Sequence, residues 1–204
     1  MDDAIYQVWM VKPSEAFYAL SKEDQDAVFA QVDEAQKAAG TESLLMCDSS
    51  WSSEKWLYFG VNRFANFEMM RKHYQGLAKF NWHRYIHSQL FLGRPEMPLP
   101  PLTAPADGQM PIYKLAVIHM LPDGWRAPQE ERDQETGKVL ENLNQVGGEL
   151  MLFLRLYSSD YYTYLNIERF PDLAAVSAHT DCMIDMGWFQ WLEADVLLGT
   201  QFQG

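Results

Sequence analysis

Short runs of bulky apolar residues recur along the chain, separated by polar turns and by amphipathic stretches. β-Branched and aromatic side chains dominate these runs, which is typical of strands. Two pairs of runs flank a short polar turn and predict β-hairpins. The pattern predicts strands at 5–11, 43–51, 55–62, 86–92, 111–120, 149–157, 161–168 and 192–198.

Apolar residues with helical spacing predict two helices in each half of the chain. The first helix begins after Ser21, a good N-cap residue, and ends at Gly40. The apolar faces are formed by residues three or four positions apart: Val28, Val32, Ala35 and Ala39; Phe67, Met70, Tyr74 and Leu77; and Val139, Leu143 and Val146 before Gly147 and Gly148.

The two halves of the chain repeat each other. A residue of the second half lies 106 positions after its partner in the first, as Arg169 does after Arg63. The shared residues include Arg63-Phe64 with Arg169-Phe170, His73 with His179, Trp82 with Trp188, and Leu92-Gly93 with Leu198-Gly199. Because the match is ungapped and rich in aromatic identities, it predicts a tandem duplication. Near the N-terminus the offset becomes 107, so Ile5 matches Ile112.

Prolines concentrate between the two halves, which suits an extended connector. The predicted organisation is a first repeat at 1–93, a proline-rich linker at 94–110 and a second repeat at 111–204. Each repeat has the order strand, helix, strand, strand, helix, strand. This βαββαβ order is the ferredoxin-like arrangement, with both helices on one side of a four-stranded antiparallel sheet.

In this element order the chain resembles the dimeric α/β-barrel superfamily, in a form that fuses two units in one chain. The start of the second helix carries the resemblance too, with Phe64 followed by Phe67 and Phe170 followed by Leu173. The resemblance implies an α+β fold in which two ferredoxin-like antiparallel sheets pack into one α/β barrel with helices outside. It also implies a range of activities, including cofactor-independent monooxygenases, haem-binding and haem-degrading enzymes, lactone isomerases and proteins without known activity.

Composition narrows the choice of partners. The chain has 204 residues, 48% of them hydrophobic, and a formal net charge of -12. That charge repels phosphate backbones and anionic lipids, so neither nucleic acid nor a membrane is an expected partner. No apolar run approaches the roughly 20 residues that span a bilayer, and the N-terminal residues do not read as a signal peptide. Cys47 and Cys182 form no metal-ligand pattern, and a cytoplasmic protein is expected.

Strand alternation separates the predicted helix-covered face of each sheet from the face inside the barrel. Leu150, Leu152, Leu154 and Leu156 form an aliphatic row that we expect under the helices. The inward rows, to which we assign Tyr58 and Asn62 in the first copy and Arg155 and Tyr164 in the second, differ between the copies. Polar, ionisable and aromatic residues concentrate there. We expect them to line a ligand-filled lumen.

The leading hypothesis is a small-molecule enzyme whose site is that lumen, acting by proton transfer or by cofactor-independent oxidation of an aromatic or polyketide-like substrate. His87 is the expected general acid or base, with Glu193 or Asp195 orienting it. Arg155, Asn62 and Gln89 would hold a developing oxyanion. The aromatic residues expected to sandwich the substrate are Trp51, Trp56, Tyr58, Tyr162 and Tyr164.

Two other functions stay open. The family resemblance makes haem an alternative cofactor, with His73, His87 and His179 as candidate ligands, although no cofactor is predicted from the residues themselves. A non-catalytic ligand-binding or stress-associated barrel is the third hypothesis. His83 and His87 flank an expected helix-to-strand junction, so they do not predict zinc. Because two copies already cover each other's sheets, we expect a monomer or a homodimer formed through helices.

Overall fold

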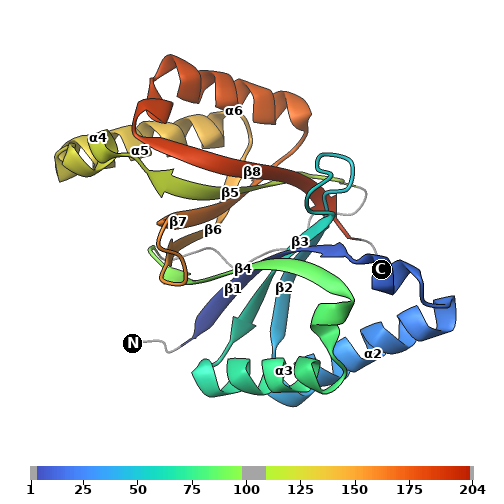
Figure 1. Cartoon of the computed structure of the whole chain (residues 1–204). Coiled ribbons are helices and arrows are strands. Elements are labelled where there is room, and N and C mark those ends of the chain that lie inside the picture. Colours follow the sequence, from blue (N-terminus) through green and yellow to red (C-terminus); the bar gives the residue numbers. More distant parts are fainter. Residues whose placement is uncertain (1–3, 98–108, 203–204) are drawn as a thin grey trace. The chain divides into compact units, whose positions relative to one another are not determined.

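A computed structural model describes residues 4–97 and 109–202. The chain forms two compact units, Met1–Arg94 and Pro95–Gly204 (Figure 1). Most of the predicted linker at 94–110 lies outside the described residues, and its first two residues, Arg94 and Pro95, end the strand Ile86–Pro95. In the described part of the chain, no helix is long and apolar enough to cross a membrane.

Unit 1 contains one four-stranded antiparallel sheet in the strand order β4-β1-β3-β2. Its helices connect β1 to β2 and β3 to β4, as the predicted order requires. The elements are β1 (Ile5–Pro13), α1 (Glu15–Tyr18), α2 (Lys22–Ala39), β2 (Glu42–Asp48), β3 (Tyr58–Phe64), α3 (Phe67–Lys79), η1 (Trp82–Arg84) and β4 (Ile86–Pro95).

Unit 2 repeats this arrangement with the strand order β8-β5-β7-β6. Its elements are β5 (Ile112–Met120), α4 (Pro122–Arg126), α5 (Gln129–Gln145), β6 (Glu149–Leu156), β7 (Tyr164–Phe170), α6 (Leu173–Asp185), η2 (Trp188–Gln190) and β8 (Leu192–Gln201). Both units are therefore ferredoxin-like, and the predicted α+β class is confirmed.

Local sequence explains where the helices begin and end. The Ser21 hydroxyl accepts a hydrogen bond from the Asp24 amide at 3.1 Å, which satisfies one free N–H of α2. Gly40 ends this helix in the left-handed conformation with φ of 59°, which costs glycine little. Asn66 and Asp172 occupy equivalent N-cap positions of α3 and α6 and accept from amides three residues on.

One face of each sheet is covered by the helices of the same unit. The Gln7 amide of β1 donates to the Tyr74 hydroxyl of α3, and the ring of Phe170 in β7 lies 5.6 Å from that of His179 in α6. Directly paired residues of antiparallel strands point to the same face, and successive residues alternate. These contacts therefore assign a face to each strand residue.

The structure reverses the faces that we expect for β3 and β7. Asn62 pairs with Gln7, and Tyr58 lies four residues before Asn62, so both face the helices rather than the opposite side. Tyr164 shares its face with Phe170 and also faces the helices. Both faces of these strands carry buried residues, so hydrophobicity alone does not tell them apart.

A register irregularity corrects the prediction for β6 as well. The pairing with β7 shifts between Leu150 and Leu152. Leu150 therefore faces the helices, while Leu152 and the leucines two and four positions later face away. Arg155 pairs with Tyr164 and lies on the helix-facing side, so its predicted inward position is wrong. A bulge changes the alternation of a strand, and periodicity alone does not reveal it.

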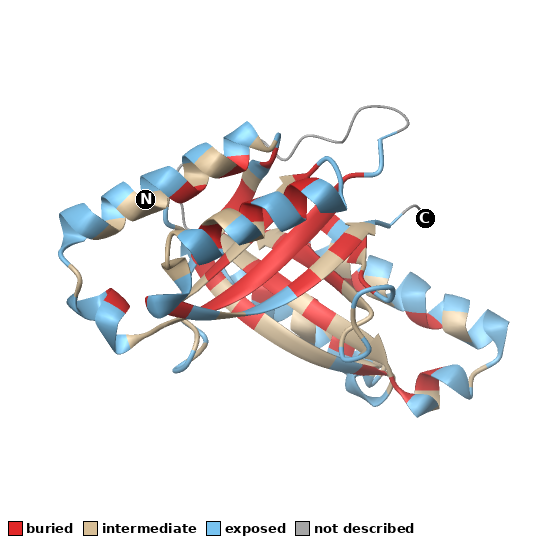
Figure 2. Ribbon diagram, turned by 90° about the horizontal axis from the view of Figure 1, so that it is seen from above, coloured by how far each residue is buried: buried red, intermediate tan, exposed pale blue. Residues whose placement is uncertain are grey.

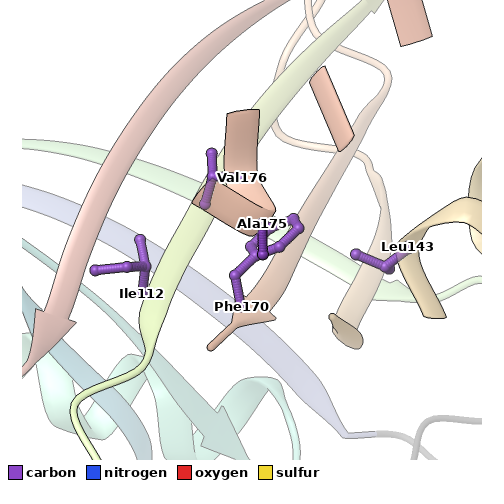
Figure 3. Packing of buried hydrophobic residues seen from close by; sticks show 5 residues of the cluster. All are labelled: Ile112, Leu143, Phe170, Ala175 and Val176. Atoms are coloured by element: carbon purple, nitrogen blue, oxygen red, sulfur yellow. The ribbon is translucent and has the colours of Figure 1, made fainter. Parts of the chain in front are cut away.

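The buried residues of each unit concentrate on its strands and on the inner sides of its helices (Figure 2). In unit 2 one cluster joins β5, β7, α5 and α6 and consists of Ile112, Leu143, Phe170, Ala175 and Val176 (Figure 3). The predicted helix residues Val139 and Leu143 are both buried in this unit. Burial of these apolar faces holds each helix pair on its sheet.

Candidate functional site

A buried ion pair lies between the sheet and the helices of unit 2. The Lys114 ammonium of β5 is 3.2 Å from Glu168 Oε2 of β7, and the two side chains are 8% and 5% exposed. They are directly paired across the two strands. Removing two charges from water is costly, so such a pair needs further polar contacts around it.

Three more polar side chains complete a network around this pair. The Asn166 amide donates to Glu168 Oε1 at 3.0 Å. His179 Nε2 of α6 lies 3.9 Å from the same oxygen. On the other side of the ring, His179 Nδ1 is 2.7 Å from Asn142 Oδ1 of α5. The network thus links the sheet to both long helices of unit 2.

The hydrogen bonds define the protonation state of His179. Asn142 Oδ1 can only accept, so Nδ1 carries the proton and Nε2 presents a lone pair. Burial lowers the pKa of His179; Lys114 lowers it further, while the Glu168 carboxylate opposes the shift. The ring is therefore neutral at pH 7, and Nε2 has no hydrogen-bond partner within the described chain.

Unit 1 has neutral residues at the matching positions. Gln7 stands where unit 2 has Lys114, and Asn62 stands where it has Glu168. His73 matches His179 but bonds to the backbone of Ala35 rather than to a side chain, and its unpartnered ring nitrogen is Nδ1. The two units therefore share a histidine but not the charges beside it.

Helix spacing accounts for the different histidine partners. A Cβ atom at Gly76 of α3 would lie 2.7 Å from the Ala35 Cβ of α2, so glycine is needed for this close approach. Unit 2 has Cys182 and Asn142 at the matching positions, and neither is small enough for the same contact. His179 is consequently hydrogen-bonded to the Asn142 side chain of α5, whereas His73 is hydrogen-bonded to the backbone of Ala35.

A second cluster lies on the opposite face of the unit 2 sheet, at one end. His119 of β5 pairs with Glu193 of β8 across the strands. The His119 ring stacks on Tyr161 with centroids 4.0 Å apart, and its Nδ1 lies 2.6 Å from the Tyr161 carbonyl oxygen. The Tyr161 hydroxyl donates to Glu193 Oε2 at 3.3 Å.

Tyr162 and Asp195 extend this second cluster. The Tyr162 hydroxyl donates to Asp195 Oδ2, and this hydrogen bond, with burial and the carboxylate charge, raises the pKa of Tyr162 to about 12. The rings of Tyr161 and Tyr162 meet edge to face at 4.9 Å. Both carboxylates are exposed, so the cluster is open to solvent.

The structure divides the predicted site residues into four groups. Glu193, Asp195 and Tyr162 come together in the second cluster. His87 and Gln89 lie on β4 of unit 1, on the face away from the helices, as predicted. The helix-facing sides hold Tyr58 and Asn62 in unit 1 and Arg155 and Tyr164 in unit 2, and the turn before β3 holds Trp51 and Trp56. Within either unit, the predicted set does not form one constellation, and its catalytic roles stay predictions.

Six residues of these networks were not among the predicted site residues: Lys114, Asn142, Asn166, Glu168, His119 and Tyr161. One signal was available for Lys114, because a lysine inside an otherwise apolar strand needs a buried partner. Asn142 gives no comparable signal, since its role depends on the distance between α5 and α6. Within the described residues, no group of three or more His, Cys, Asp or Glu side chains could hold a metal ion.

The comparisons with known proteins concern the fold. No protein-family model and no curated protein matches the sequence. Among solved structures, the chlorite dismutase of Candidatus Nitrospira defluvii in complex with imidazole is 11% identical with a TM-score of 0.80, covering 99% of this chain and 92% of that chain. A cyanide complex of a variant of that enzyme is also 11% identical, with a TM-score of 0.76 and coverage of 99% and 92%.

A candidate chlorite dismutase, TA0507, is 14% identical with a TM-score of 0.69, and the match covers 98% of this chain and 95% of that chain. At these identities the likeness shows the fold alone. The predicted ferredoxin-like α+β fold is confirmed at that level.

Proposed function

We propose that the chain binds haem in unit 2, with His179 as the candidate axial ligand. One observation carries the proposal: His179 is a buried, neutral imidazole whose Nδ1–H is held by Asn142 and whose Nε2 has no hydrogen-bond partner in the described chain. The chlorite dismutase-like neighbours in the structure comparison are haem proteins. The similarity favours the haem alternative over cofactor-independent oxidation.

The donor chemistry of His179 fits an iron porphyrin. A metal-binding imidazole needs one deprotonated ring nitrogen, and its other N–H is usually held by an acceptor. His179 meets both conditions, with the free lone pair on Nε2 at the tip of the ring. His73 leaves Nδ1 unpartnered instead, and this nitrogen lies beside the carbon that carries the side chain. The matching histidine of unit 1 is therefore more hindered.

The chain's own residues would hold the ring and control its charge. Asn142 fixes the orientation of His179, and Lys114 neutralises the Glu168 carboxylate beside Nε2. When bound, an iron porphyrin supplies an open coordination position for small ligands. Because His179 is 0% exposed, the ligand has to enter between α6 and the sheet, and we expect slow binding.

Haemin titration of the purified chain tests the proposal. We expect a Soret band that shifts on binding and that is lost or displaced in His179→Ala. The matched control is His73→Ala, which removes the equivalent histidine of unit 1 and should leave the band unchanged. Circular dichroism would establish that both variants are folded.

Three results of the haemin titration would distinguish the candidate ligands. The absence of any haem complex in the wild-type chain would overturn the proposal. A complex that His179→Ala leaves unaltered, and that His73→Ala removes, would move the axial ligand to unit 1. A complex that neither variant alters would point to a different ligand, with His87 the remaining predicted candidate.

A second candidate function is cofactor-free acid–base catalysis at the second cluster of unit 2. The contacts of Tyr161 with Glu193 and of Tyr162 with Asp195 favour it, because three predicted site residues meet there. The His119 Nδ1–H donates to a backbone carbonyl, so Nε2 is its basic nitrogen.

A panel of aromatic hydroxy compounds, offered to haem-free protein, tests this second candidate. Turnover that Glu193→Gln abolishes and His179→Ala preserves would support it. Turnover insensitive to Glu193→Gln would contradict it. Binding without turnover would leave the non-catalytic hypothesis.

A further inference from the structure

The outer side of α6 lacks the charged residues that usually cover a surface helix. Leu173 and Ile184, at its two ends, are 53% and 57% exposed. The helix contains no lysine or arginine. Apolar residues on both the inner and the outer side of a helix indicate that both sides are covered. The exposed positions of α6 are Leu173, Ala174, Ser177, Ala178, Asp181, Ile184 and Asp185.

The matching helix of unit 1 has the opposite charge. At its exposed positions α3 carries Arg71, Lys72 and Lys79 against a single acid, Glu68, although the whole chain has a formal net charge of -12. Phe67, its first residue, is 63% exposed. The outer side of α3 is therefore basic with an apolar end, whereas that of α6 is acidic and largely apolar.

The charges on these two helices are not used within the described part of the chain. There, Arg71, Lys72 and Lys79 form no ion pair, and neither do Asp181 and Asp185. Three other helices, by contrast, each have an ion pair between residues three or four positions apart. The charged side chains of α3 and α6 can therefore pair with those of another molecule.

We infer that α6 of one copy of this chain docks antiparallel on α3 of a second copy. The two helices have 13 residues each and so match in length. In this arrangement Ile184 of one copy lies beside Phe67 of the other. Asp181 lies opposite Arg71 and Lys72. Opposite ends of the two helix dipoles also come together, which is favourable.

The contact joins two different surfaces, so it is heterologous, and each copy offers one surface of each kind. A single pair of helices buries less area than a stable interface needs, and we expect association in the micromolar range. The charges select the partner surface and make the association weaker at high salt. No residue of this contact binds haem in the proposed function, so the inference does not rest on that proposal.

Two variants that each alter one surface test the contact. Ile184→Lys puts a cation on α6, and Arg71→Glu with Lys72→Glu reverses the charge of α3. In sedimentation velocity each variant alone should stay monomeric at concentrations where the wild-type chain associates. An equimolar mixture should form a heterodimer, because one chain keeps α3 intact and the other keeps α6 intact. The matched control, Lys22→Glu with Lys37→Glu, reverses two exposed charges of α2 and should associate as the wild type does.

A charge exchange within one chain guards against misfolding as the cause. Asp181→Lys and Asp185→Lys, added to Arg71→Glu and Lys72→Glu, exchange the charges of the two helices, and self-association should return. Circular dichroism would establish that each variant is folded.

Three results would overturn the inference. The first is a wild-type chain that remains monomeric at about 1 mM. The second is a mixture of the two folded single-surface variants that forms no heterodimer. The third is association that Ile184→Lys removes but Arg71→Glu with Lys72→Glu preserves, because α6 would then pair with α6 of the second copy.

Discussion

His179 Nδ1 lies 2.7 Å from Asn142 Oδ1, whereas the matching His73 bonds to the backbone of Ala35. The same histidine position thus has a side-chain partner in one unit and a main-chain partner in the other. The difference follows from the helix spacing that Gly76 sets in unit 1.

Removing Asn142 should destabilise the chain. In Asn142→Leu the buried Nδ1–H of His179 loses its acceptor, and an unsatisfied buried polar group costs about 1–3 kcal/mol. Urea denaturation followed by circular dichroism measures the change in the free energy of unfolding. The matched control, Gln36→Leu, alters a partly buried residue of α2 beside the Ala35 position and should cost less. Equal losses would show that Asn142 has no special contact with His179.

The Lys114–Glu168 pair should show strong coupling. Lys114→Gln or Glu168→Asn alone leaves one buried charge without its partner, which costs about 3–5 kcal/mol. The double variant copies Gln7 and Asn62 of unit 1 and should be more stable than the sum of the two single effects implies. A double-mutant cycle by chemical denaturation measures this coupling. Strictly additive effects would mean that the two charges do not interact.

Stability should fall as the pH drops below neutrality. Burial, the main cause for both residues, lowers the pKa values of His73 and His179 from the ordinary 6.5. Below that value the unfolded chain binds protons that the folded chain excludes, so unfolding becomes easier. Above it, both states hold neutral rings and this effect vanishes. Between pH 8 and pH 5, the melting temperature should decline less steeply in the double variant His73→Gln/His179→Gln than in the wild-type chain. An unchanged slope would assign the decline to other groups.

The order of strands and helices was predictable from the sequence, because it depends on local patterns. Ser21 and Gly40 mark the ends of α2 in the sequence as they do in the structure. The faces of β3 were not predictable, because residues on both of its faces are buried. The polar network around Lys114 and Glu168 depends on contacts between segments that are distant in the sequence. A single lysine in a strand does not identify its partner.

The raised pKa of Tyr162 should depend on Asp195. The hydrogen bond to this carboxylate is the main cause of the rise to about 12, because the bond favours the protonated phenol. Asp195→Asn should therefore bring the Tyr162 pKa down toward the ordinary value. Absorbance of the phenolate against pH measures this, with Tyr162→Phe identifying the transition. A Tyr162 titration that is the same in Asp195→Asn and in the wild-type chain would contradict the hydrogen bond between Tyr162 and Asp195.

Assembly through helices is a further prediction, and α6 is the candidate surface. Its exposed positions include Leu173 and Ile184, at 53% and 57% exposure, and Ala178, where α3 has Lys72. Light scattering should find a monomer, or a dimer that Ile184→Lys dissociates. A dimer that survives this change but dissociates when β3 residues are altered would contradict the prediction.

The number of haem molecules bound per chain tests the central claim most directly. We assign the ligand to unit 2, because among the described residues this unit holds the buried histidine whose Nε2 has no hydrogen-bond partner, His179. Titration of the full chain with haemin, with iron quantified against protein after gel filtration, should end at one haem per chain. Two per chain would contradict the asymmetry between the units, and none would contradict the haem proposal.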